Sequence, residues 1–250
     1  MVVFALYNLK GGVGKTSSCV NLAYLAARDG FSTLLWDMDP QGSASFYCNT
    51  QQKMKGSIKK ILTSSAISKA ISPTDYDNLD IIAADESAKS MNTMLEEMSN
   101  SKKKLKQTLE PLDGVYDFVF LDCPPGLSSL AENIFLAADF VVLPIIPTPL
   151  SIRTLEMVNT FFEDKKLDSS KLRCFFSMAD LRKPLHAEQV GNYKKSKQFY
   201  TNFIPYFADI EKMGVYESPV HTFAPKSKAA KYYQKLWDEI KDTNLDIQED

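Results

Sequence analysis

The sequence predicts an α/β fold, in which a mostly parallel sheet is flanked by helices on both faces. Short and almost continuously apolar runs recur along the 250 residues, and segments with helical periodicity separate them. Strands that are apolar throughout are buried on both faces. Such strands in alternation with helices are typical of parallel sheets with right-handed crossovers. Because no linker rich in Pro, Gly or Ser divides the chain, we expect a single domain over residues 1–241.

The predicted elements follow one another in a regular order. The apolar runs predict six strands, at residues 2–7, 32–36, 79–82, 118–121, 140–143 and 173–177. A helix follows the first strand, because Cys19 and Leu22 lie on one helical face and Gly30 ends the pattern. Two further helices are predicted at residues 150–162 and 227–241. The polar stretch 51–77 predicts one short helix plus irregular structure.

The composition excludes several classes of protein. With 44% hydrophobic and 24% charged residues, the chain is typical of a soluble globular protein. No apolar run approaches the roughly 20 residues that cross a bilayer, so we expect a cytoplasmic protein. The formal net charge of −2 provides no general attraction to nucleic acid, and DNA binding would therefore need a local basic patch. The last residues, 242–250, are acidic and should fray.

A glycine-rich segment joins the first strand to the first helix. It reads Lys10, Gly11, Gly12, Val13, Gly14, Lys15, Thr16 and Ser17. Glycines let the backbone N–H groups wrap around phosphate oxygens, and the helix N-terminus adds partial positive charge. Lys15 would then pair with the β- and γ-phosphates of ATP, and Thr16 would bind Mg²⁺. The strict P-loop pattern G-x-x-x-x-G-K-[ST] is not satisfied, because its first glycine would fall at Leu9.

Carboxylates follow two of the other predicted strands. Asp37 and Asp39 come directly after the second strand, in the sequence D-M-D-P-Q-G. Asp122 ends the apolar strand that precedes a C-P-P-G turn. At the carboxyl edge of a parallel sheet, such groups can reach Mg²⁺ and the water that attacks a γ-phosphate. An isolated D-x-D is more typical of a turn or a helix cap, but the nearby glycine-rich segment favours the catalytic interpretation.

The segment K-G-G-V-G-K-T resembles the deviant Walker A motif of the ParA/MinD family of P-loop ATPases. The resemblance implies that Lys10 reaches the nucleotide of a partner subunit, in a homodimer that sandwiches two ATP molecules. It also implies that Asp39 orients or activates the attacking water, while Asp37 supports the magnesium shell. Asp122 would accept a hydrogen bond from magnesium-bound water. The expected catalytic residues are therefore Lys10, Lys15 and Asp39, and the expected cofactors are ATP and Mg²⁺.

The resemblance continues more loosely to the C-terminus. By similarity, the region around Ile204 and Pro205 lies near the adenine, which makes Pro205 and Tyr206 candidate base contacts. ParA-type segregation proteins often carry Arg-Asn after Ile-Pro, whereas this chain has Tyr206 and Phe207. This departure puts nonspecific DNA binding of the ParA type in doubt.

Basic clusters nevertheless remain that could contact DNA phosphates without sequence preference. They are Arg182, Lys183, Lys194, Lys195, Lys197, Lys226, Lys228 and Lys231. Lysine clusters are more often solvated helix faces. The resemblance implies that a ParB-like protein stimulates slow ATP hydrolysis, and that the dimer positions a plasmid, a chromosome or another cargo. Nucleoid association would follow if DNA binding holds.

Three rival functions remain to be weighed. A MinD-like membrane ATPase would need a lipid-binding C-terminal helix, and the last predicted helix has an apolar stripe; we expect that stripe to pack on the domain, because an acidic tail follows it. An iron–sulfur ATPase would need two well-placed cysteines per subunit, whereas the four cysteines are scattered and should be reduced and mostly buried. The presence of Lys15, Thr16, Asp39 and Asp122 together argues against a protein that has lost hydrolysis.

Overall fold

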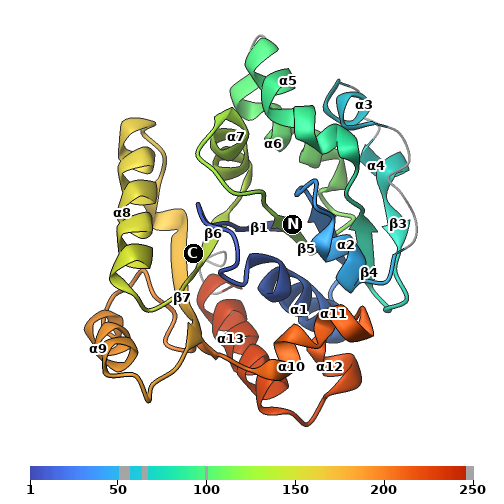
Figure 1. Cartoon of the computed structure of the whole chain (residues 1–250). Coiled ribbons are helices and arrows are strands. Elements are labelled where there is room, and N and C mark those ends of the chain that lie inside the picture. The colour runs from blue at the N-terminus through green and yellow to red at the C-terminus, as the bar shows by residue number, and fades with distance from the viewer. Residues whose placement is uncertain (51–56, 64–66, 99–100, 246–250) are drawn as a thin grey trace.

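The computed structural model describes residues 1–50, 57–63, 67–98 and 101–245. Within them an eight-stranded sheet lies between two layers of helices (Figure 1). The strand order is β3-β4-β2-β5-β1-β6-β7-β8. Every neighbouring pair is parallel except β3 and β4, which are antiparallel. The predicted fold class is therefore confirmed.

Six strands correspond to the six apolar runs. The strands are β1 Val2–Leu6, β2 Thr33–Asp37, β3 Ser72–Pro73, β4 Leu79–Ile82, β5 Phe118–Asp122, β6 Phe140–Ile145, β7 Leu172–Ala179 and β8 Ile204–Pro205. Sequence analysis missed β3 and β8, because a strand of two residues carries no periodicity. Both include a proline, which a sheet accepts at its edges.

Thirteen α-helices lie in the described part of the chain. They are α1 Lys15–Arg28, α2 Ser43–Tyr47, α3 Ile58–Thr63, α4 Ile67–Ala70, α5 Met91–Glu97, α6 Lys104–Leu109, α7 Ser129–Ala137, α8 Pro149–Asp164, α9 Pro184–Tyr193, α10 Ala208–Glu211, α11 Met213–Tyr216, α12 Val220–Phe223 and α13 Lys228–Leu245. Short 3-10 helices cover Glu86–Ser90, Ser101–Lys103, Glu110–Leu112 and Ser169–Lys171. The expectation of one short helix in 51–77 was wrong, since α3, α4 and β3 all lie there. Residues 51–56 and 64–66 are outside the described residues.

Helix α13 covers one face of the sheet together with α1 (Figure 1). Its apolar stripe is buried, as we expected: Tyr233, Leu236, Trp237 and Ile240 are each at most 1% exposed. The ring of Trp237 packs edge-on against Phe118 of β5, with centroids 5.5 Å apart. Burial of these side chains supplies most of the stability of such a helix.

The end of α13 differs from the predicted domain boundary at residue 241. The helix continues to Leu245, so Asp242 does not begin an irregular tail. The last turns are anchored, because Lys241 Nζ and Trp237 Nε1 both donate to Asp29 Oδ2 at the end of α1, at 3.1 and 2.9 Å. Residues 246–250 lie outside the described residues, and the fraying of the tail stays a prediction.

The sheet topology determines where loops converge. Strand β1 lies between β5 and β6; strands β2 to β5 lie on one side of it, and β6 to β8 follow one another on the other side. Ligands of open α/β sheets bind at such a switch point, outside the carboxyl ends of the strands. In register, Asp122 of β5 lies beside Leu6 of β1 and beside Asp37 of β2. The glycine-rich segment and two of the predicted carboxylates therefore meet at one edge.

Candidate functional site

The glycine-rich loop has a backbone that only glycine adopts readily. Gly12 and Gly14 have φ values of 72° and 89°, in the left-handed region. A Cβ on Gly14 would stand 2.9 Å from Ser177 Oγ of β7, so this position has no room for a side chain. Gly11 and Gly12 are exposed, whereas Val13 is buried. The loop thus presents its backbone to solvent at the N-terminus of α1, where an anion is favoured.

Lys15 is a buried cation within this loop. Lys15 is only 7% exposed, and its Nζ donates to the carbonyl oxygen of Lys10 at 3.0 Å. Burial lowers the pKa of Lys15, while the nearby Asp122 and Cys123 raise it. An ammonium has three hydrogens, so at least two donors remain for the phosphate oxygens that we expect here.

Asp122 is a fully buried carboxylate that makes no salt bridge with the described residues, although the Thr16 side chain lies close enough to lower its pKa. It is 0% exposed, and neither oxygen has a hydrogen-bond partner among the described residues. Burial raises the pKa of Asp122 well above its ordinary value, and Asp37 raises it further, against smaller lowering effects of Thr16 and Lys15. An unpaired buried carboxylate costs free energy, and such groups are found paired, coordinating a metal ion, or protonated. The donor set therefore fits Mg²⁺.

Asp37 holds the following loop in place. Its Oδ2 accepts hydrogen bonds from the backbone N and Oγ of Ser45, at 2.8 and 2.7 Å, and Oδ1 accepts from the backbone N of Asp39 at 3.3 Å. Burial raises the pKa of Asp37 to about 6, despite these hydrogen bonds. Asp39 is half-buried, and its Oδ1 accepts from the backbone N of Gln41 at 2.9 Å. Asp37 therefore orients Asp39, and sequence analysis missed the part played by Ser45.

A magnesium ion at this edge would need few protein ligands. The described residues contain no group of three or more His, Cys, Asp or Glu side chains placed to hold a metal ion. Mg²⁺ in nucleotide sites takes most of its oxygen ligands from phosphates and water, with only one or two from the protein. The Thr16 hydroxyl and the Asp122 carboxylate, with Asp37 behind them, would supply these.

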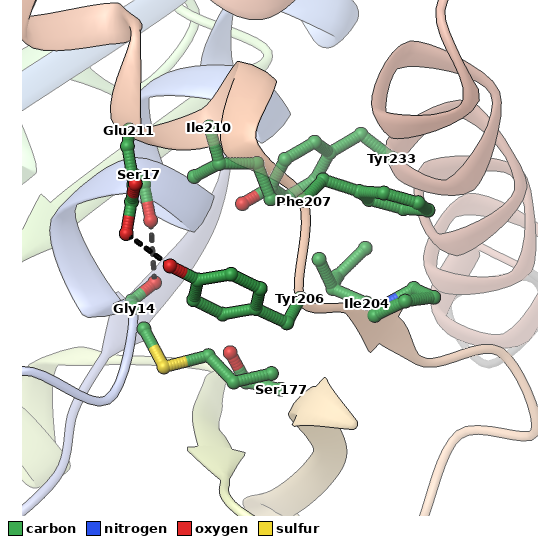
Figure 2. Close-up of a pocket in the computed structure, with 11 residues that line it drawn as sticks. Gly14, Ser17, Ser177, Ile204, Tyr206, Phe207, Ile210, Glu211 and Tyr233 are labelled. Carbon is green, nitrogen blue, oxygen red and sulfur yellow. Dashed lines mark hydrogen bonds between the residues drawn. The ribbon is translucent and has the colours of Figure 1, made fainter. Parts of the chain in front are cut away.

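A largely apolar pocket lies beside the glycine-rich loop (Figure 2). Pro205 and Tyr206 line it together with Gly14 and Ser17, so the structure brings the candidate base contacts next to the loop. In Figure 2 the ring of Tyr206 extends across the pocket, and its hydroxyl donates to a carboxylate oxygen of Glu211. A second pocket continues past Gly14 to Lys15, Thr16, Ser43 and Tyr47.

The two pockets share several lining residues. Sequence analysis did not find Glu211, Ile210, Met178 or Tyr233, although the first three line both pockets and Tyr233 lines the apolar one. They come from β7, α10 and α13. No local signal marks a pocket assembled from single side chains of distant segments.

Lys10 contacts the start of α8 and lines neither pocket. Its Nζ donates to the carbonyl oxygen of Leu150 at 3.2 Å. Its backbone N donates to Asn8 Oδ1 at 3.0 Å. The catalytic, nucleotide-binding and metal-binding roles assigned to the site residues stay predictions.

The eight basic residues considered for DNA binding are all exposed. Arg182 is already paired, since its Nε and Nη2 donate to the two carboxylate oxygens of Asp180 at 2.8 and 3.0 Å. The remaining seven are lysines. One directly precedes α9, three follow the end of α9, and three lie just before α13 or in its first turn. Among the described residues, no helix combines the length and hydropathy required to cross a membrane.

Comparison with known proteins decides the family. Residues 1–173 match a family model described as an AAA domain. The chromosome-partitioning ATPase Soj of Treponema pallidum is 31% identical over 244 residues, which cover 93% of this chain and 94% of that protein. The chain belongs to the ParA/Soj family of partition ATPases.

Solved structures show how widely this fold is used. A plasmid partition protein of Borrelia burgdorferi bound to AMPPNP superposes with a TM-score of 0.82, at 22% identity, over 97% of this chain and 98% of that one. A cobyrinic acid a,c-diamide synthase of Mycobacterium smegmatis, bound to an ATP analog and magnesium, has a TM-score of 0.77 at 25% identity, over 95% and 93% of the two chains. Since a synthase shares the fold of this ParA/Soj protein, the fold alone does not determine function.

Proposed function

We propose that this ParA/Soj-family protein binds ATP with Mg²⁺, hydrolyses it slowly, and cycles between a monomer and a homodimer that sandwiches two ATP molecules. The observation that carries the proposal is the buried, unpaired carboxylate of Asp122, beside Lys15 and Thr16 at the carboxyl edge of the sheet. The ionised form of a carboxylate in that position is costly unless a cation binds next to it. Nucleotide-bound magnesium is the cation that such a site accepts.

Each residue of the site would have a distinct task. The backbone of the glycine-rich loop and Lys15 would bind the phosphates, and Thr16 and Asp122 would hold Mg²⁺. Magnesium, once bound, would neutralise negative charge on the β- and γ-phosphates. Asp39, held by Asp37, would orient the attacking water. Pro205 and Tyr206 would contact the base in the apolar pocket.

Lys10 would act across the dimer interface. Two polyphosphates that face each other need more positive charge than one P-loop lysine per subunit supplies. In the structure the Lys10 ammonium contacts one carbonyl oxygen, that of Leu150, which is a weak partner for a charge. Exchange of this contact for a phosphate of the partner subunit would favour the dimer.

The cellular task would be to segregate or position a plasmid, a chromosome or another large cargo, with nonspecific DNA as the matrix. The partition roles named for the relatives support this task, as do seven exposed lysines in three clusters. A ParB-like protein would stimulate hydrolysis and release the dimer from DNA. The protein would then be cytoplasmic and associated with the nucleoid.

A MinD-like membrane role is less well supported. It would need the apolar stripe of α13 to face lipid. That stripe packs against α1 and the sheet instead, with Trp237 at 0% exposure. Release of the helix would uncover a large part of the core, so we do not propose a membrane role.

DNA binding of an Asp39→Ala variant tests the proposed task. The variant should keep ATP bound, and its affinity for nonspecific DNA should be measured with ATP and with ADP over a salt series. We expect binding with ATP only, and a steep loss of affinity with salt.

Replacement of three lysines near α13 should reduce the salt slope by up to about three, whereas replacement of three lysines around α6 should not. The two sets are Lys226, Lys228 and Lys231, and Lys102, Lys103 and Lys106. Equal binding with ATP and ADP, or none with either, would contradict the DNA role.

A further inference from the structure

The two residues that follow β1 connect the glycine-rich loop to its neighbours. Asn8 is 1% exposed; its Nδ2 donates to the carbonyl oxygen of Pro144 at 2.8 Å, and its Oδ1 accepts from Lys10. Tyr7 is 0% exposed, and its hydroxyl donates to the carbonyl oxygen of Gly126 at 3.0 Å. One short segment therefore contacts the glycine-rich loop, the end of β6 and the loop after β5.

The hydroxyl of Tyr7 is not needed to fill space. Its ring packs edge-on against Phe135 of α7, with centroids 4.7 Å apart and an interplanar angle of 89°. Phenylalanine would make the same apolar contact. A buried hydroxyl costs free energy unless it is hydrogen-bonded. Burial raises the pKa of Tyr7, and Cys123 raises it further, so the phenol stays neutral and keeps its hydrogen for donation.

The partner of Tyr7 lies in a loop with few other restraints. The loop contains Pro124 and Pro125, which have no backbone N–H to donate, and Gly126 has a φ of 102°. Within the described residues, the bond from Tyr7 is the one recorded hydrogen bond that anchors residues 124–127. Apart from the packing of Leu127 against the core, the loop therefore depends on a side chain just after β1 for its position.

The loop after β5 lies next to the place where we expect the γ-phosphate. It begins directly after Asp122, which lies beside Lys15 at the edge where we expect the end of the triphosphate. Loops at this place commonly change between triphosphate and diphosphate states. The backbone that precedes the glycine-rich loop and the backbone that follows Asp122 are joined by the Tyr7 hydroxyl.

We propose that Tyr7 is a positioning residue that couples the glycine-rich loop to the loop after β5, and so helps the protein to distinguish ATP from ADP. The inference rests on the proposed function, because it assumes that ATP occupies this site. Tyr7 touches no phosphate itself. It holds the Gly126 carbonyl, and thereby the neighbouring backbone, in the arrangement that receives the γ-phosphate.

The test compares two tyrosine hydroxyls in the full-length protein. Tyr7→Phe removes the bond to Gly126 and keeps the ring. Tyr116→Phe is a matched control, because the Tyr116 hydroxyl donates to Asp80 at 2.6 Å, before the start of β5 and far along the strand from the nucleotide edge. Affinities for AMPPNP and for ADP, both with Mg²⁺, should be measured by calorimetry, together with the thermal midpoint of each variant.

We expect Tyr7→Phe to weaken AMPPNP binding by about three- to tenfold, the equivalent of one hydrogen bond, and to leave ADP binding within about twofold. Tyr116→Phe should leave both affinities unchanged. Hydrogen exchange of residues 124–128 in the AMPPNP complex should increase for Tyr7→Phe only. Equal changes for both nucleotides, or unchanged affinities in a folded variant, would overturn the proposal. ATP hydrolysis by the unmodified protein tests the proposed function separately, because the role of Tyr7 is tested only by the affinities for AMPPNP and ADP.

Discussion

Replacement of Asp122 by asparagine should stabilise the ligand-free protein. The carboxylate is fully buried and neither oxygen has a hydrogen-bond partner among the described residues. Asparagine has nearly the same shape and no charge, so the variant avoids most of the cost of an unpaired buried charge. We expect a gain of about 2 kcal/mol in the free energy of unfolding at pH 8, or about 4–8 °C in the thermal midpoint.

The gain should depend on pH with a definite sign. Burial raises the folded-state pKa of Asp122, so above its unfolded-state pKa of about 4 the folded protein keeps a proton that the unfolded chain has lost. The stability of the unmodified protein therefore falls as the pH rises through that window. The advantage of Asp122→Asn should be small at pH 4 and should grow toward neutral pH.

Magnesium and ATP should remove more than half of this benefit. A ligand at 100 times its dissociation constant stabilises the unmodified protein by about 2.7 kcal/mol, and a tenfold weaker affinity reduces this to about 1.4 kcal/mol for Asp122→Asn. Urea unfolding with and without Mg·ATP measures both quantities. Asp164→Asn, on the exposed end of α8, is the control and should change stability by less than about 0.5 kcal/mol. The reasoning fails if Asp122→Asn is no more stable without ligand and gains as much from Mg·ATP as the unmodified protein.

Three further predictions concern other contacts. Gly14→Ala should abolish nucleotide binding in calorimetry, because φ is 89° and the added methyl would stand 2.9 Å from a neighbouring hydroxyl oxygen; unchanged affinity would refute this. Trp237→Phe should cost about 1–3 kcal/mol in urea unfolding, since it removes the hydrogen bond to Asp29. Burial alone would raise the pKa of Asp29, but the hydrogen bonds from Trp237 and Lys241 lower it. The stability lost in Trp237→Phe should therefore shrink below about pH 4, where Asp29 becomes protonated. A loss of stability that does not change with pH would contradict this prediction. Tyr206→Ala should weaken ATP binding severalfold, about 1 kcal/mol, through lost contact with the base, and equal affinity would remove Tyr206 from the site.

The central strands and the phosphate loop could be predicted because their signals are local. Each buried strand is a continuous apolar run, and the glycines stand directly between the first strand and the first helix. The proximity of Asp37 and Asp122 could be predicted as well, because the carboxyl ends of parallel strands meet at one edge of the sheet.

The rest of the site depends on contacts between distant segments. The apolar pocket takes single residues from β7, β8, α10 and α13, and none of these residues forms a motif by itself. Ser45 is an ordinary serine until the fold places it against Asp37. Tyr7 belongs to an apolar run, and the partner of its hydroxyl, Gly126, is 119 positions away. Such pairings follow from packing, which periodicity and composition do not encode.

The mass of the Asp39→Ala protein in solution, measured by light scattering with Mg·ATP and with Mg·ADP, tests the ATP-sandwich dimer most directly. We predict twice the monomer mass with ATP and the monomer mass with ADP, and a monomer in both when Lys10 is also replaced by alanine. A monomer with Mg·ATP, under conditions where calorimetry shows the nucleotide to be bound, would contradict the account.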